Sequence, residues 1–202
     1  MVLDRLKNAE DDIMAPIAKK LDYLNPNVIT CLSFTLMLAA SYFIYLGATA
    51  LIYAFILLII GSFLDALDGV VARISGKTSV IGDFLDHSLD RFADLALILG
   101  VGFSQYCSLQ IAIFALGGVL LASYMGTQAQ AVGVGRIYGG VATRADRLIA
   151  LIVGVILQYF YTEPVIFDLK VLEIVMVYFA VFGIITAIYR FFVVLCRLHR
   201  KL

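Results

Sequence analysis

Residues 65–94 read DALDGVVARISGKTSVIGDFLDHSLDRFAD, and this stretch decides the fold because it places charge inside an apolar chain. It holds six of the fifteen acidic residues, whereas the flanking segments GSFL and LALILGVGF contain no charged residue. A carboxylate inside a membrane costs roughly 2.5–3.5 kcal/mol on insertion scales. Six of them between apolar segments therefore predict bound cations or a water-filled cavity.

The spacing of this stretch predicts two helices whose polar faces meet. Small and acidic residues recur at intervals of three and four, which places each set on one helix face. The first set is Asp65, Asp68, Gly69 and Ala72, and the second is Gly82, Asp86, Asp90 and Asp94. Two such faces enclose a site of carboxylate oxygens, which Mg²⁺ and Mn²⁺ prefer. Zn²⁺ would prefer His or Cys, and only His87 is nearby.

Four of the aspartates are interpreted as metal ligands: Asp65, Asp68, Asp86 and Asp90. Four carboxylates carry more charge than one divalent ion neutralises, so two ions are expected. A two-metal site stabilises the entering and leaving oxygens of a phosphoryl displacement. The alternative, that aspartates are helix caps and solvated charges, suits Asp83 at a predicted helix start. It does not suit the other four, which recur on helix faces within or beside apolar segments.

The same stretch resembles the signature of the CDP-alcohol phosphotransferase family in residue type and in spacing. The matching run is Asp65-x-x-Asp68-Gly69-x-x-Ala72-Arg73, eight residues, then Gly82-x-x-x-Asp86-x-x-x-Asp90. The general family pattern, six membrane helices with the signature across the second and third, covers nearly the whole chain. The resemblance implies that a CDP-linked alcohol donates its phosphoryl-alcohol part to a hydroxyl group and that CMP is released.

The resemblance also implies roles for single residues. The four aspartates would hold the metals, and Asp90 would in addition take the proton of the acceptor. Gly69, Ala72 and Gly82 would leave room for the cytidine, and Arg73 would contact the donor phosphate. A family element of the form Pro-Asn-x-x-Thr is matched by Pro26, Asn27 and Thr30, which the resemblance places on the nucleotide side. A helix cap explains Asn27 equally well.

Composition predicts an all-α integral membrane protein of one domain, residues 1–202. The chain is 62% hydrophobic with a mean hydropathy of +0.99, and a spanning helix needs about twenty mostly apolar residues. Six segments qualify: 27–47, 49–73, 80–104, 107–131, 145–163 and 171–196. Residues 25–202 are thus expected to form a six-helix bundle. Residues 1–24 alternate charged and apolar residues, which predicts an amphipathic helix at the cytoplasmic interface.

The zero net charge hides a polarised distribution. If six helices are threaded in turn, most Lys and Arg residues fall at one face, and the opposite face keeps Lys170 with Glu163, Asp168 and Glu173. The positive-inside rule then predicts a multi-pass protein of the cell membrane with both termini and the carboxylates on the cytoplasmic side. The basic residues lie in several loops and form no recognition motif, so no nucleic-acid partner is expected.

Three arginines near or inside the last two spans predict a phosphate site. Arg144 and Arg147 open the fifth span and Arg190 lies within the sixth. An arginine inside a membrane indicates a functional site, and guanidinium groups bind phosphate bidentately. We expect the three to converge beside the carboxylates; the alternative is that they extend to lipid headgroups. Arg91 and Asp94 either pair with each other at i, i+3 or contribute to the acceptor site.

The region 123–148 resembles the family branch whose acceptor is a phosphorylated polyol. Ser123, Tyr124 and the three arginines have counterparts there. Inositol-phosphate members carry a Lys and an Arg where this chain has Gly126 and Gln128. The loss of two cations favours a smaller acceptor, glycerol phosphate, with inositol phosphate as the alternative.

The leading interpretation is a phospholipid synthase in the lipid bilayer. Its donor would be a CDP-lipid, either CDP-diacylglycerol or CDP-archaeol, and its acceptor a small phosphorylated alcohol. The family resemblance further implies a homodimer. An interpretation of another class is a divalent-cation transporter that uses the same carboxylates. It would favour binding at mid-bilayer and repeated halves, and the sequence shows no internal repeat.

Overall fold

A computed structural model describes residues 14–135, 137, 139–141 and 143–199. This part of the chain contains six long helices and one short 3-10 helix: α2 (Pro26–Leu46), η1 (Ala48–Ala50), α3 (Leu51–Ile74), α4 (Val80–Gly102), α5 (Leu109–Ala131), α6 (Arg144–Phe160) and α7 (Val171–His199). Residues 14–20 form a further helical segment before α2. No β-strand occurs among these residues apart from an isolated bridge between Ile166 and Leu169. The all-α prediction is confirmed.

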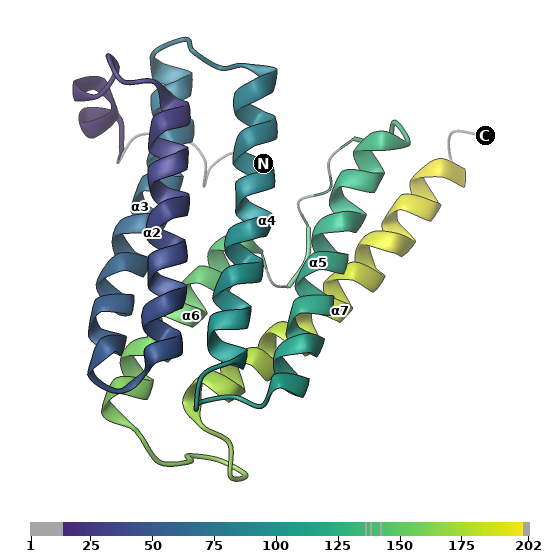
Figure 1. Ribbon diagram of the computed structural model, residues 1–202. Coiled ribbons are helices and arrows are strands. Elements are labelled where there is room, and N and C mark those ends of the chain that lie inside the picture. The colour runs from purple at the N-terminus through teal and green to yellow at the C-terminus, as the bar shows by residue number, and fades with distance from the viewer. Residues whose placement is uncertain (1–13, 136, 138, 142, 200–202) are drawn as a thin grey trace.

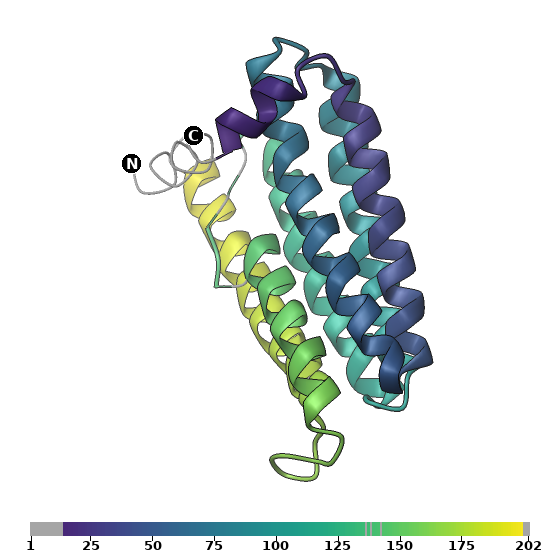
Figure 2. The same ribbon diagram turned by 90° about the vertical axis from the view of Figure 1, so that its left-hand side faces the viewer.

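The helices pack as a closed ring. Each long helix contacts two principal neighbours, in the order α2, α3, α6, α7, α5, α4 and back to α2. Figure 1 shows α2, α3 and α4 running side by side, with α7 inclined to them and α5 lying along it. Figure 2 shows α6 and α7 on one side of the molecule and α2 and α3 on the other. Helices α3 and α4, which carry the acidic stretch, therefore meet different partners: α6 packs on α3, and α5 packs on α4.

Small residues let neighbouring helices approach closely. The Ser41 hydroxyl of α2 donates to the carbonyl of Ala96 in α4 at 2.5 Å, and a Cβ on Gly100 would lie 2.6 Å from the Ser41 carbonyl oxygen. A Cβ on Gly183 of α7 would lie 2.6 Å from the backbone of Gly118 in α5. Close backbone contact of this kind is typical of helix interfaces in membranes.

Four elements are long and apolar enough to cross a membrane, namely α2, α5, α7 and the segment Ala48–Ile74 that contains α3. Helix α4 is less apolar because it carries the aspartates and Arg91. Helix α6 has 17 residues and spans about 26 Å, less than the roughly 30 Å of a hydrocarbon core. The chain is thus a membrane protein, and the two helices that differ from the expected six spans are α4, which carries several charges, and the short α6.

Several expected boundaries are corrected. The cap of α2 is Asn25, whose side chain accepts a hydrogen bond from the Asn27 amide at 3.1 Å, so the capping interpretation of Asn27 is wrong. Helix α6 ends at Phe160 rather than at residue 163, because Tyr161 is extended and Pro164 follows. Helix α5 begins at Leu109, two residues later than expected, after the N-cap Ser108.

The expected interfacial helix is described only in its second half, since residues 1–13 lie outside the described residues. Ala18 in this half is fully buried and belongs to a cluster with Ile29 of α2 and Leu67 and Val70 of α3. Leu21 and Leu24 pack against the same cluster. Part of the apolar face that the sequence assigned to lipid is therefore covered by the protein.

Candidate active site

An open cavity of about 220 Å³ lies between the start of α2, the end of α3 and the start of α4. Six residues that the family resemblance assigned to the nucleotide all line it: Asn27, Thr30, Gly69, Ala72, Arg73 and Gly82. The lining also includes Asp68 and Asp86, together with Pro26, Lys77, Thr78, Ser79 and Asp83. Residues expected on three separate segments of the sequence are thus brought to one cavity.

The local sequence explains the shape of the cavity. Asn25 caps α2 and Ser79 caps α4, where the Ser79 hydroxyl accepts from the Gly82 amide at 3.0 Å. The cavity therefore lies at two helix N-termini, whose partial positive charge favours anions. A Cβ on Gly82 would lie 3.2 Å from the Asn27 side-chain oxygen. Glycine at this position keeps the wall thin, so a ligand can approach the helix backbone.

The four predicted metal ligands form two pairs with different surroundings. Asp68 and Asp86 line the cavity, whereas Asp65 and Asp90, one helical turn away on the same faces of α3 and α4, contact Arg144. Asp68 is only 6% exposed, and its Oδ2 atom has no hydrogen-bond partner among the described residues. A buried carboxylate oxygen without a partner is unfavourable, and a bound cation would supply one.

The donor atoms of this cluster suit a hard divalent ion. One ligand atom each from Asp86, His87 and Asp90 lie within 4.8 Å of one another. The His87 ring nitrogens are 3.1 Å from Asp83 Oδ1 and 3.4 Å from Asp86 Oδ2. Carboxylate oxygens predominate, and they are the ligands that Mg²⁺ and Mn²⁺ prefer. The residues present therefore fit the expected metals.

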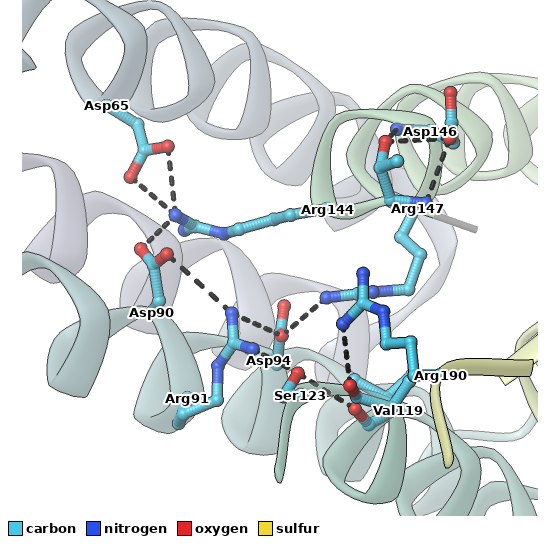
Figure 3. Close-up of polar contacts among 12 residues, drawn as sticks. Asp65, Asp90, Arg91, Asp94, Val119, Ser123, Arg144, Asp146, Arg147 and Arg190 are labelled. Atoms are coloured by element: carbon cyan, nitrogen blue, oxygen red, sulfur yellow. Dashed lines mark hydrogen bonds and ion pairs between the residues drawn. The ribbon is translucent and has the colours of Figure 1, made fainter. Parts of the chain in front are cut away.

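Arg144 contacts two of the predicted metal ligands directly. Its Nη1 atom donates to both carboxylate oxygens of Asp65 at 2.9 Å and also bonds to Asp90 (Figure 3). The sequence predicted Arg144 beside the carboxylates, and the structure puts it between them. Because the guanidinium shares these oxygens, Arg144 and a cation are alternative partners of Asp65 and Asp90.

A chain of ion pairs continues from this point along α4. Arg91 Nη2 lies 3.6 Å from Asp90 Oδ2 and 3.3 Å from Asp94 Oδ2, and Arg147 Nη2 lies 2.9 Å from Asp94 Oδ2. The expected pairing of Arg91 with Asp94 is confirmed, and Arg147 of α6 extends it. We call Asp65, Asp90, Asp94, Arg91, Arg144 and Arg147 the inner network. Its three carboxylates face three guanidiniums, which lowers the cost of burying each charge.

Arg190 of α7 reaches the far end of the inner network. Figure 3 shows its guanidinium beside that of Arg147. It donates to the carbonyl oxygen of Gly139 at 2.9 Å and to that of Ala122 at 2.6 Å. Arg144 therefore lies beside the predicted metal ligands as expected, whereas Arg147 pairs with Asp94 and Arg190 contacts main-chain carbonyls rather than a carboxylate. The alternative, extension to lipid headgroups, is wrong for Arg144 and Arg147, whose side chains are 18% and 7% exposed and contact carboxylates.

His87 and Lys77 were not assigned to the site from the sequence, and one contact of Arg91 was not predicted. His87 joins the carboxylates of α4, and its place inside the acidic run was the available signal. Arg91 bonds to the Ser123 hydroxyl of α5 as well as to the aspartates, and its charge in an apolar helix was the signal. Lys77 lines the cavity and bonds to the turn before α2, for which the sequence holds no local signal.

These features define a class. A helical membrane protein with an oxygen-rich cation site, adjacent arginines and a cavity at two helix N-termini is suited to transfer a phosphate-containing group. The chain belongs to the CDP-alcohol phosphatidyltransferase family, whose sequence model matches residues 23–189. It is therefore a transferase of phospholipid biosynthesis, and the enzyme class expected from the signature is confirmed.

Known proteins with similar sequence or structure narrow the branch. The chain is 36% identical over 130 residues to archaetidylinositol phosphate synthase of Pyrococcus horikoshii, a match that covers 64% of this chain and 68% of that protein. The crystal structure of Mycobacterium tuberculosis phosphatidylinositol phosphate synthase with bound CDP-DAG has a TM-score of 0.74 at 27% identity, over 91% of this chain and 94% of that one. The same synthase in complex with manganese and citrate also has a TM-score of 0.74 at 27% identity, over 90% and 88%.

These relatives decide between the interpretations left open. Membership of an enzyme family decides against the cation transporter. The branch with phosphorylated polyol acceptors is confirmed. The preference for glycerol phosphate finds no support, because the relatives named above are an archaetidylinositol phosphate synthase and a phosphatidylinositol phosphate synthase.

Proposed function

We propose that this protein transfers the phosphatidyl or archaetidyl group of a CDP-lipid to the hydroxyl of inositol phosphate and releases CMP. The observation that carries the proposal is that Asp68 and Asp86 of the signature line the cavity, while Asp65 and Asp90 of the same signature contact Arg144, the first of a cluster of arginines. Donor and acceptor would thus meet on either side of the same carboxylates. Proximity of this kind supplies a large part of the rate of a two-substrate reaction.

Asp65, Asp68, Asp86 and Asp90 would hold two Mg²⁺ or Mn²⁺ ions. When bound, such ions neutralise the donor diphosphate and stabilise the charge that develops during in-line displacement. The unpartnered Asp68 oxygen supports this assignment. The manganese complex of the related synthase supports the choice of ion.

The nucleotide part of the donor would occupy the cavity. Asn27 and Thr30 supply polar groups there, Gly69, Ala72 and Gly82 supply space, and Arg73 supplies a positive charge for the donor phosphate. The lipid chains would remain in the bilayer, since α2 and α3 present large exposed apolar side chains such as Tyr42, Tyr53 and Ile56. The CDP-DAG complex of the related synthase supports a CDP-lipid donor.

The acceptor would bind on the side of the inner network. Arg147 and Arg190 lie within electrostatic range of each other there, and together with Arg144 they would hold the acceptor phosphate through charge-assisted hydrogen bonds. A cation bound to Asp65 and Asp90 would compete with Arg144 for these oxygens and leave its guanidinium for the phosphate. Asp90 lies between the two sides and would accept the proton of the attacking hydroxyl.

Topology and assembly complete the proposal. Residues 25–202 would form six spans. Helices α4 and α6 would cross the membrane with their charged side chains paired inside the protein. Residues 1–24 would lie at the membrane interface. The site and both termini would face the cytoplasm of the cell membrane, where cytidine nucleotides occur, in agreement with the distribution of Lys and Arg. A homodimer is proposed from the family resemblance alone.

Glycerol phosphate remains a second candidate acceptor because of one position. A Cβ on Gly126 would lie 3.1 Å from Arg190 Nη1, so this glycine lies directly at the proposed acceptor site. A chain without a cation there offers fewer charged contacts to a large polyol phosphate.

A substrate panel tests the proposal. Purified protein is incubated with CDP-diacylglycerol or CDP-archaeol, with Mg²⁺ or Mn²⁺, and with inositol phosphate, glycerol phosphate or serine, and CMP release and lipid product are measured. We expect metal-dependent transfer to inositol phosphate. Asp168→Asn is the matched control, since Asp168 is exposed at the opposite end of the molecule. Transfer to serine alone, or no CMP release with any pair, would contradict the proposal.

A further inference from the structure

Lys77 makes a contact that the signature does not account for. It lies in the connection between α3 and α4, and its Nζ atom donates to the main-chain carbonyl of Asp22 at 2.6 Å and to that of Leu24 at 3.1 Å. These carbonyls belong to the turn that joins the helical segment 14–20 to α2. One side chain therefore ties two segments that are more than fifty residues apart in the sequence.

The turn that Lys77 contacts is followed directly in the sequence by residues that line the cavity. Leu24 is followed by the cap Asn25, and then by Pro26 and Asn27, both of which line the cavity. Lys77 lines the same cavity from the opposite side, together with Thr78 and Ser79 of its own connection. The two hydrogen bonds thus join the start of α2 to the α3–α4 connection across the rim of the proposed donor site.

The apolar side of the turn is fixed separately. Leu21 and Leu24 pack against the cluster of Ile29, Leu67 and Val70. This contact holds the segment on the outer faces of α2 and α3 but does not set the distance between the turn and the α3–α4 connection. Figure 2 shows the segment 14–20 lying across the end of the bundle at which α3 joins α4.

We infer that Lys77 is a positioning residue for the nucleotide part of the donor, because it holds the turn at residues 22–24, and with it Pro26 and Asn27, against the cavity. This inference rests on the proposed function. Arg73 and the aspartates would contact the nucleotide and the metals themselves, whereas Lys77 acts through the turn. Since no residue of the inner network lines the cavity that Lys77 lines, loss of Lys77 affects the donor and leaves the acceptor unchanged.

The test compares Lys77→Met with Lys77→Arg and with Lys20→Met in the full-length protein. Met keeps an unbranched chain of similar length but has no donor, Arg keeps donors and charge, and Lys20 is an exposed lysine of the segment 14–20. We expect Lys77→Met to raise the dissociation constant for CMP and the KM for CDP-lipid about tenfold, which corresponds to about 1.4 kcal/mol. The KM for the acceptor and kcat stay within about twofold. Lys77→Arg restores most of the affinity, and Lys20→Met changes nothing.

Tryptic cleavage after Lys19 and Lys20 supplies a readout that is independent of any activity. Cleavage at these two lysines, directly before the turn, is expected to be faster in Lys77→Met than in the wild type, and to proceed at the wild-type rate in Lys77→Arg. Equal cleavage in the wild type, Lys77→Met and Lys77→Arg, or an equal loss in donor KM, acceptor KM and kcat, would overturn the inference. Absence of CMP binding by the wild type would instead contradict the proposed function. The cleavage rates would still show whether Lys77 holds the turn at residues 22–24.

Discussion

The cavity and the inner network use the same residue types in opposite ways. In the cavity, Asp68 keeps a buried oxygen without a hydrogen-bond partner among the described residues, and small residues leave open space beside it. In the inner network, Asp94 is held by two guanidiniums and Asp90 by two. An incompletely satisfied site favours binding of a ligand, whereas a paired one favours a single structure. The contrast indicates that Asp94 serves mainly the fold, Asp68 serves mainly ligand binding, and Asp65 and Asp90 lie where the two regions meet.

The largest effect is expected in the cavity. Asp68→Asn removes a charged metal ligand, and we expect transfer to fall by roughly 10³-fold or more, since metal ions supply several kcal/mol of transition-state stabilisation. The melting temperature should remain at or above that of the wild type, because the substitution removes a buried charge. CMP release and thermal unfolding measure the two effects, with Asp168→Asn as control. Near-normal turnover would show that Asp68 does not bind an essential metal.

In the inner network, by contrast, loss of a charged side chain should lower the melting temperature. Arg147→Gln removes a guanidinium from the buried Asp94, and breaking a buried ion pair costs about 3–5 kcal/mol. We therefore expect a clear fall in melting temperature. Adding Asp94→Asn should recover part of the loss because no unpaired carboxylate remains. If the melting temperature of the double variant fell by the sum of the decreases in the two single variants, the two residues would not be coupled.

Arg190 tests whether the acceptor binds at the far end of the inner network. Arg190→Ala should raise the KM for the acceptor about ten- to hundredfold, the range for loss of a charge-assisted hydrogen bond. The KM for the CDP-lipid should change far less. Lys170→Ala, at the opposite end of the molecule, is the control for removal of a cation. A change confined to the donor KM would place Arg190 outside the acceptor site.

The smallest effect is expected for metal binding by Arg144→Gln. Because Arg144 shares oxygens with Asp65 and Asp90, its removal should tighten Mn²⁺ binding by a few-fold, measured by electron paramagnetic resonance of free Mn²⁺. Transfer should nevertheless decrease, because the acceptor phosphate loses a partner. Weaker Mn²⁺ binding would mean that Arg144 supports the metal site rather than competing with it.

The two regions also differ in how far they could be predicted from sequence. Spacing predicted the polar faces of the two consecutive helices that carry the aspartates, and the family resemblance supplied the other lining residues, Asn27, Thr30 and Arg73. The contact of Arg144 with Asp65 depends on α6 packing against α3, which no local pattern records. The hydrogen bond from Lys77 to the Leu24 carbonyl likewise depends on packing between segments that are far apart in the sequence. Asn25 rather than Asn27 caps α2 because Pro26 occupies the first helical position, where its missing N–H is tolerated.

The most direct test is anomalous scattering from crystals soaked in Mn²⁺. The account predicts two peaks enclosed by Asp65, Asp68, Asp86 and Asp90, with the Arg144 guanidinium moved away from Asp65 and Asp90. Absence of any peak at these carboxylates, or peaks only at the opposite end near Asp168 and Glu173, would contradict it.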